Sequence, residues 1–347
     1  MKKEEKLGMT DYLVSTRRKI KQQFFEQINQ IVDWRLISNI INKHYTKGED
    51  VCGRPAYSGL ILFKMGLLQT WYGLSDYEVE DRINDSISFS RFVGISLDES
   101  VPDHSVLSRF RKEMTEKGVY EKLFKALNKQ LEKHKIIVKS GAIVDASIID
   151  TPLMPKGSPT YEVCDEREAT QENQTEATVV KHVSSGTDLE ARWIKKGGEL
   201  RYGYKKHVVT DTEGMILGVH TTAANVNEIA NLAEVLDCAD LPKQIPIYAD
   251  KGYQSENNRK ILKERKMKSR ILKKAKKNQP LTAIELKINK LIGKTRFKIE
   301  RCFGSIKRWF QSTEARYRGL AKMHTQNLME SIAYNLYRSP GIILSSS

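Results

Sequence analysis

Three acidic residues have the side-chain type and the sequence setting of metal-binding catalytic groups: Asp145, Asp250 and Glu300. Asp145 lies within the apolar segment GAIVDASII, and Asp250 ends the short apolar segment IPIYAD. Glu300 lies in the basic segment RFKIERCFGSIKRWF. A buried carboxylate costs several kcal/mol unless a positive group compensates it, and the apolar segment around Asp145 contains no Arg or Lys. A bound metal ion would supply the missing charge.

This set of carboxylates is typical of metal-dependent phosphodiester chemistry. In that chemistry, two divalent ions about 4 Å apart activate the attacking oxygen and stabilise the leaving oxygen. Mg²⁺ takes hard oxygen ligands and keeps some of its water, so two Asp and one Glu suffice alongside phosphate oxygens. We therefore expect two Mg²⁺ ions per active site, with Mn²⁺ as a substitute. Taken singly, Asp145 also fits an edge-strand acid, Asp250 a turn or N-cap residue, and Glu300 a solvated helix charge.

The segments that carry these acids alternate between strand and helix patterns. The candidate strands are GAIVDASII, YGYKKHVVTDTEG, MILGVHTTAANV, IPIYAD and SRILKK, and the candidate helices are NEIANLAEVLDCA and NRKILKERK. A turn at 212–214 joins the second and third strands into a hairpin. Alternating strands and helices predict an α/β fold for residues 136–338. Residues near 151–200 are polar and predict an inserted mobile loop, and residues 339–347 are expected to form a C-terminal tail.

The segment around Glu300 is expected to be an amphipathic helix. Its apolar residues recur at helical spacing, as Ile299, Phe303, Ile306 and Phe310. Lys307 follows Glu300 by two helical turns, so both side chains project from one face. We expect the acid to bind metal and the base to meet phosphate.

Residues 1–135 carry apolar residues at helical spacing throughout, which predicts an all-helical N-terminal domain. Ser75 with Glu78 has the spacing of a capping box, and the segment VPDHSVLSRFRKEM resembles part of a helix-turn-helix. Arg109 and Arg111 in that segment are candidates for reading DNA sequence. Their alternative role is that of solvated charges on the domain surface.

The composition indicates a folded protein, and its positive charge fits binding of a polyanion such as nucleic acid, generic solubility or a basic structural protein. The chain has 347 residues, 39% hydrophobic content and a formal net charge of +15, and its Lys and Arg residues are concentrated between 251 and 308. No stretch reaches the roughly 20 apolar residues of a membrane-spanning helix, and no signal peptide is evident. The four cysteines form no CxxC pair. We expect a cytoplasmic protein with no membrane partner.

Several segments together resemble transposases of the insertion-sequence-five family, within the DDE superfamily. They are GRPAYSGLILFKMGLLQTWYGLSDYEVEDRINDSISFSRFVGISLDESVPDHSVLSRFRKEM, GAIVDAS, YGYKKHVVTD, TTAANVNE, YADKGY and RFKIERCFGSIKRWF. The resemblance covers most of the chain. It departs from the family pattern TxANVxD at Glu228, where Asp is usual.

The resemblance implies a ribonuclease-H-like mixed sheet flanked by helices, with Asp145, Asp250 and Glu300 as the three metal-binding acids. It also implies that Arg301 and Lys307 contact the DNA end. The expected activity is binding of double-stranded DNA at terminal inverted repeats, hydrolysis at the element ends and strand transfer into target DNA. Bringing two ends together implies a homodimer or a larger assembly.

Three rival functions fit part of the pattern. A metal-dependent nuclease without strand transfer would use the same three acids. A DNA-binding regulator derived from a transposase would keep the basic surface and is expected to lack one of the acids, yet all three are present. A basic structural protein of a ribonucleoprotein would leave the acids at the strand ends without a role.

Overall fold

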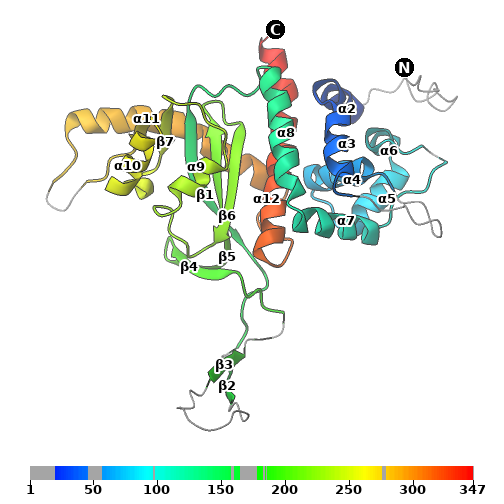
Figure 1. Cartoon of the computed structure of the whole chain (residues 1–347), viewed down its shortest axis with the longest axis horizontal. Helices are drawn as coiled ribbons and strands as arrows, with labels where there is room; N and C mark the ends of the chain where they lie inside the picture. The colour runs from blue at the N-terminus through cyan, green and yellow to red at the C-terminus, as the bar shows by residue number, and fades with distance from the viewer. Residues whose placement is uncertain are drawn as a thin grey trace.

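The computed structural model describes residues 20–45, 57–96, 98–157, 160–164, 178–182, 184, 186–275 and 279–346. Figure 1 shows a helical part beside a mixed sheet with its own helices, and a small hairpin that projects below the sheet. None of the helices in these ranges is long and apolar enough to span a membrane.

The N-terminal part is helical in its described residues, as the sequence predicts. Its elements are α2 (Ile20–Ile31), α3 (Trp34–Asn42), α4 (Gly59–Tyr72), α5 (Asp76–Asp85), α6 (Ile87–Val93), α7 (His104–Glu116) and α8 (Val119–Lys133). The predicted capping box is confirmed: the Ser75 hydroxyl accepts from the Glu78 N–H, and the Glu78 carboxylate accepts from the Ser75 N–H. Asp103 caps α7 by accepting from the N–H groups of Ser105 and Val106. These caps fix where α5 and α7 begin.

The sheet combines antiparallel and parallel pairing. Its strands are β1 (Ala142–Asp150), β4 (Arg192–Lys196), β5 (Glu199–Asp211), β6 (Ile216–Ala223), β7 (Pro246–Ala249) and β8 (Lys268–Ile271). The order is β4-β5-β1-β7-β8, with β6 also paired to β5. β5 is antiparallel to β1, β4 and β6, whereas β1, β7 and β8 are mutually parallel. The hairpin predicted around 212–214 is confirmed by the pairing of β5 with β6.

Helices flank this sheet. They are α9 (Leu232–Asp237), α10 (Glu256–Glu264), α11 (Ala283–Trp309) and α12 (Leu320–Ser346), with a short 3₁₀ turn, η1, at Lys251–Tyr253. α9 packs on β5 and β6, α11 packs on β1 and β7, and α12 packs on β6. A mixed sheet flanked by helices and preceded by helices is the ribonuclease-H-like α/β arrangement that the resemblance implied.

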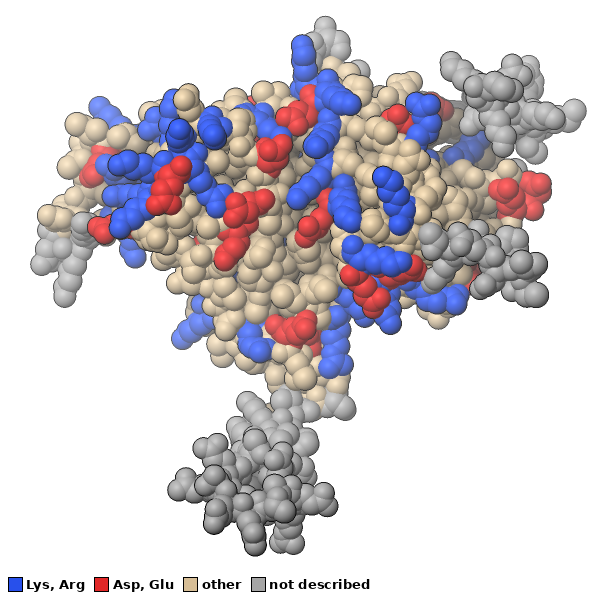
Figure 2. Space-filling view, viewed as in Figure 1, with Lys and Arg blue, Asp and Glu red and all other residues tan. Residues whose placement is uncertain are grey.

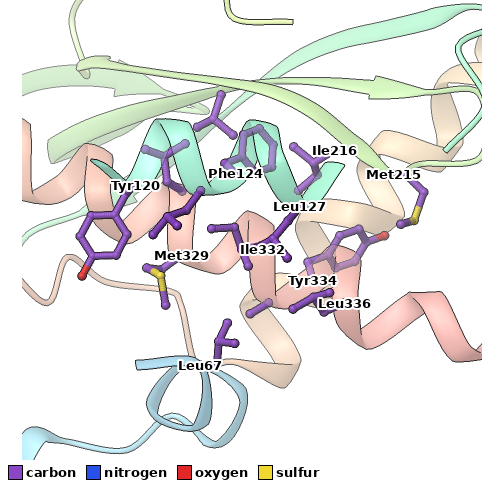
Figure 3. Packing of buried hydrophobic residues seen from close by; sticks show 14 of the residues in the cluster. Leu67, Tyr120, Phe124, Leu127, Met215, Ile216, Met329, Ile332, Tyr334 and Leu336 are labelled. Carbon is purple, nitrogen blue, oxygen red and sulfur yellow. The ribbon is translucent and has the colours of Figure 1, made fainter. Parts of the chain in front are cut away.

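α12 is shared between the two parts of the molecule, because it lies between the sheet and the N-terminal helices (Figure 1). The Trp71 indole of α4 donates to the Ala333 carbonyl at 2.9 Å, and the Asn335 side chain accepts from the Ile216 N–H at 2.9 Å. Figure 3 shows the apolar side of this contact, where residues of α8, α12 and β6 pack together: Tyr120, Phe124, Leu127, Ile216, Met329 and Ile332. One hydrophobic core therefore joins the helical part to the sheet.

The segment near 151–200 contains strands as well as loop. β2 (Thr160–Cys164) pairs with β3 (Thr178–His182), and β4 forms a hairpin with β5 around Gly197 and Gly198. Residues 165–177, which belong to the predicted mobile loop, lie outside the described residues. The segment predicted as a tail, 339–347, continues α12 as far as Ser346.

Candidate active site

Strand pairing brings Asp145 and Asp250 to the same part of the sheet. β1 and β7 are parallel neighbours, with Val144 opposite Ala249 in the register. Asp145 directly follows Val144 in the sequence and Asp250 directly follows Ala249, so the two acids are level with each other. Asp250 directly follows β7, and Asp145 lies within β1 at the point where its parallel pairing with β7 ends. The edge at which parallel strands end is where sites assemble in α/β sheets.

A single guanidinium group lies between the two acids. Arg296 of α11 donates from Nη2 to Asp145 Oδ2 at 2.8 Å, and its Nη1 lies 3.5 Å from Asp250 Oδ1. The Arg296 side chain is 10% exposed, that of Asp145 17% and that of Asp250 36%. The two carboxylates therefore converge on one partly buried positive charge.

The environment of Asp145 opposes its ionisation. Burial raises the pKa of Asp145 above its usual value, and the nearby charge of Glu228 raises it further. Arg296 and a hydrogen bond from the Ala146 N–H act in the opposite direction. A positive group next to this carboxylate therefore favours its ionised form.

Tyr253 and Glu228 complete the surroundings of the acid pair. The Tyr253 side chain is fully buried, and its hydroxyl has no hydrogen-bond partner among the described residues. Burial raises the pKa of Tyr253 well above its usual value, and the charges of Glu228, Asp145 and Asp250 add to this. Glu228 pairs with the buried Lys205 at 3.5 Å. The site thus has an unused hydroxyl donor close to three carboxylates.

α11 carries the third predicted acid. The helix buries Ile299, which confirms the predicted stripe, while Glu300 is exposed and forms no ion pair or hydrogen bond with the described residues. Glu300 follows Arg296 by four residues, so both project from nearly the same face of the helix. Within the described ranges, no group of three His, Cys, Asp or Glu side chains is close enough together to hold a metal ion. The structure therefore brings Asp145 and Asp250 together, and Glu300 lies nearby on α11 without joining them.

The basic candidates on α11 differ in their setting. Arg301 is exposed. Lys307 is half-buried, with Nζ 3.5 Å from the Ile148 carbonyl near the end of β1. Burial lowers the pKa of Lys307, as does the charge of Arg201, while Asp150 opposes this. Lys and Arg side chains gather where α10 and α11 lie (compare Figures 1 and 2).

The two arginines predicted to read DNA have different environments. Arg109 is exposed, and among the described residues its hydrogen bonds are to Ser105 of its own helix. Arg111 is 14% exposed and forms a two-pronged ion pair with Asp76, and its guanidinium lies 4.5 Å from the centre of the Tyr317 ring. The structure gives Arg111 an internal contact in place of the surface position expected of a DNA-reading side chain.

Sequence reasoning missed Arg296. Its signal was present, because Arg296 lies four residues before Glu300 and three before Ile299 in the same helical stripe. A charged residue on the buried face of an amphipathic helix requires a partner of opposite charge. The predicted strand acids were the available partners.

Two family comparisons match most of the chain. Residues 138–336 match the family described as Transposase DDE domain, and residues 14–113 match Transposase domain (DUF772). The chain belongs to the DDE transposase family. A curated relative is the transposase for insertion sequence element IS1106 of Neisseria meningitidis serogroup B, which is 36% identical over 233 residues, covering 67% of this chain and 76% of that protein. This transposase therefore has the enzyme class that the resemblance implied.

Solved structures give a much weaker likeness. The Mos1 transposase paired-end complex with left transposon end is 11% identical, covers 90% of this chain and 86% of that one, and has a TM-score of 0.22. The Mos1 strand transfer complex has a TM-score of 0.20 at 11% identity, covering 95% of this chain and 98% of that one. TM-scores this low support no argument about this transposase, whose assignment depends on the family matches.

Proposed function

We propose that this transposase binds the terminal inverted repeats of its own insertion sequence, hydrolyses the phosphodiester bond at each end and transfers the freed strand into target DNA. The observation that carries the proposal is the convergence of Asp145 and Asp250 on Arg296, at the point where the parallel pairing of β1 with β7 ends in a DDE transposase domain. Glu300 is the third acid of the proposed site. All three lie on elements that pack directly on one another, since α11 packs on β1 and β7.

The acid pair fits a divalent cation. Both carboxylates already contact one positive group, and carboxylate oxygens are the ligands that Mg²⁺ and Mn²⁺ prefer. Asp145, Asp250 and Glu300 would hold two such ions, with Glu300 approaching from the adjacent helix. When bound, the ions supply charge that activates the attacking oxygen and stabilises the leaving oxygen.

The remaining proposed roles concern DNA. Arg301 and Lys307 lie on the same helix as Glu300, and we assign them contacts with the phosphate backbone close to the reacting bond. The exposed Lys and Arg residues of α10, β8 and α11 would extend that contact along the duplex: Arg259, Lys260, Lys263, Lys268, Arg270, Lys287, Lys290 and Arg308. Arg109, exposed on α7, remains the candidate for sequence reading, whereas Arg111 is occupied by Asp76. Phosphate contacts position the DNA, and base contacts specify it.

Joining two ends in one reaction requires two active sites in the same complex, so we propose a homodimer or larger assembly on DNA. The basic region over α10 and α11 would then bind one element end per subunit. The proposed domain division is an N-terminal DNA-binding and dimerisation part, 1–135, and a catalytic part, 136–338.

The test uses a labelled plasmid that carries the DNA flanking the gene. Purified protein is incubated with Mg²⁺, Mn²⁺ or EDTA, and cleaved and joined products are separated. Asp250→Ala is compared with Asp240→Ala, because Asp240 is an exposed aspartate whose side chain is 90% accessible. The proposal predicts metal-dependent cleavage and joining in wild type and in Asp240→Ala, and neither in Asp250→Ala.

Other outcomes identify the rival functions. Metal-dependent cleavage without joined products would replace the proposal by a nuclease. Tight binding of the ends with no chemistry in any metal would replace it by a DNA-binding regulator. Full activity of Asp250→Ala would refute the assigned site.

A further inference from the structure

The position of Arg296 between the two strand acids has a cost that needs an explanation. The whole residue is 8% exposed, and its Nε is buried without a hydrogen-bond partner among the described residues. A buried donor that forms no hydrogen bond costs roughly 1–3 kcal/mol. Two guanidinium nitrogens, Nη2 and Nη1, thus contact Asp145 and Asp250, and the third, Nε, has no hydrogen-bond partner among the described residues.

The acids, in turn, depend on that guanidinium. Two carboxylates side by side in a partly buried place repel each other strongly unless a cation lies between them. The buried Lys205 does not supply that charge, because its ammonium group contacts Glu228 and the Val226 carbonyl. Among the residues the structure describes, Arg296 is the cation that contacts both Asp145 and Asp250.

We infer that Arg296 is a positioning residue that takes the place of the metal in the metal-free protein. It holds Asp145 and Asp250 together before an ion arrives, and it must move away for the ion to reach the same oxygens. This inference rests on the proposed metal site at those two acids. The donation from Nη2 at 2.8 Å uses Asp145 Oδ2, an oxygen that a metal ion would also require.

The position of Arg296 on α11 links its movement to the third acid. Glu300 is one turn further along the same face, exposed and without a partner among the described residues. With the guanidinium in place, the two aspartates and Glu300 do not form a three-acid cluster. Withdrawal of Arg296 would vacate the space between α11 and the strand ends, which Glu300 must approach to complete the ligand set.

The consequence is competition between an internal cation and the metal. When a ligand must first displace an occupant, its apparent affinity is its intrinsic affinity multiplied by the fraction of molecules that are competent to bind. The DNA-free protein should therefore bind metal more weakly than the same carboxylates would if Arg296 did not contact them. Removal of the guanidinium should strengthen metal binding, although most substitutions beside a metal site weaken it.

The test measures Mn²⁺ binding to metal-stripped, DNA-free protein, by titration calorimetry or by the loss of the free-ion electron paramagnetic resonance signal. Arg296→Gln is expected to bind Mn²⁺ at least about tenfold more tightly than wild type, which corresponds to about 1.4 kcal/mol. Lys294→Gln is the matched control: it removes one positive charge from the same helix at an exposed position, and its affinity should stay close to that of wild type.

Thermal unfolding provides a second readout that does not depend on activity. In EDTA, Arg296→Gln should melt below wild type because the two carboxylates lose their shared cation. Addition of Mn²⁺ should raise its melting temperature by more than it raises that of wild type, because a ligand that binds only the folded state stabilises it by an amount that grows with the logarithm of its affinity. Arg296→Lys keeps a charge that can contact one carboxylate at a time, so its affinity should be intermediate, and it replaces Arg296→Gln if that variant does not fold.

Weaker or unchanged Mn²⁺ binding in Arg296→Gln, or equal strengthening in Lys294→Gln, would overturn the inference. Absence of Mn²⁺ binding in all variants would also overturn it. The proposed function is judged separately, by the cleavage and joining of DNA ends in wild type. A wild type that cleaves and joins, together with an Arg296→Gln variant that binds metal no better, would sustain the function and refute the role of Arg296.

Discussion

The ion pair between Arg111 and Asp76 should contribute to stability and not to DNA binding. Arg111 Nη2 lies 2.6 Å from Asp76 Oδ2, and Nη1 lies 2.9 Å from Oδ1 and 3.3 Å from the Gln69 side-chain oxygen. The side chains are 14% and 25% exposed. The pair joins α7 to α5, and the stacked Tyr317 ring extends the contact to the segment that precedes α12.

The expected cost follows from this geometry. Loss of one partner of a fully buried pair costs about 3–5 kcal/mol, because the other charge is left uncompensated. Residual exposure of both side chains lets water compensate part of that loss, so Arg111→Ala should lower the free energy of unfolding by about 2–3 kcal/mol. A double-mutant cycle with Asp76→Asn should give a coupling energy of about 1.5–2 kcal/mol.

The pH dependence of unfolding provides a check on the same pair. Burial alone raises the pKa of Asp76, but the hydrogen bonds and charge of Arg111, helped by Gln69, outweigh it and lower the pKa below the usual 3.8. The stabilisation is therefore present above the unfolded-state pKa and is lost as the pH falls through the lowered folded-state pKa. Asp76→Asn should remove that part of the acid dependence.

Urea unfolding followed by circular dichroism measures the cycle, and filter binding to element-end DNA measures affinity. Arg109→Ala serves as the matched control, because Arg109 lies two residues away on α7 but is exposed. We expect Arg109→Ala to weaken DNA binding with little change in stability. A coupling energy near zero, together with a loss of DNA affinity in Arg111→Ala, would refute the structural role of this pair.

Three further predictions concern the sheet and the site. Gly203→Ala should destabilise the protein by about 3 kcal/mol, because an added Cβ would collide with the Ile149 carbonyl of the paired strand β1. Urea unfolding measures this, and wild-type stability in the variant would contradict the register of β1 with β5. Burial lowers the pKa of His207 to about 3 from its usual 6.5, so stability should fall by about 1.4 kcal/mol per pH unit on acidification between these values, and His207→Gln should lack this slope. Tyr253→Phe should leave stability unchanged or raise it by about 1 kcal/mol, because the buried hydroxyl it removes has no partner among the described residues; a clear loss of stability would reveal a hydrogen bond.

Local sequence signals predicted those features of the fold that depend on neighbours along the chain. The capping box at Ser75, the hairpin after Asp211 and the buried stripe through Ile299 each depend on residues a few positions apart. The approach of Asp145 to Asp250 was also implied, since both end or interrupt apolar strands of an α/β pattern. These inferences required no knowledge of how distant segments pack.

The features that were missed depend on distant contacts. Arg296 meets Asp145 across 151 residues of sequence, and no local pattern encodes that pairing. Arg109 and Arg111 lie in the same short segment, so the sequence does not distinguish them. Arg111 contacts Asp76 and Tyr317 because of the way the helices pack. The pairing of β4 with β5 did have a local signal, Gly197 and Gly198 between WIKK and ELRY, but the polar composition of the surrounding segment obscured it.

The shared position of α12 imposes an order on biosynthesis. Residues 320–346 leave the ribosome well after residues 20–133, yet the Trp71 indole and the apolar faces of α4 and α8 are covered by α12. Domains generally fold as units during synthesis, N-terminal first, but here the early helices remain incompletely covered until the last helix is available. A chain that ends shortly after Glu300 would therefore contain all three proposed catalytic acids but lack the helix that covers α4 and α8.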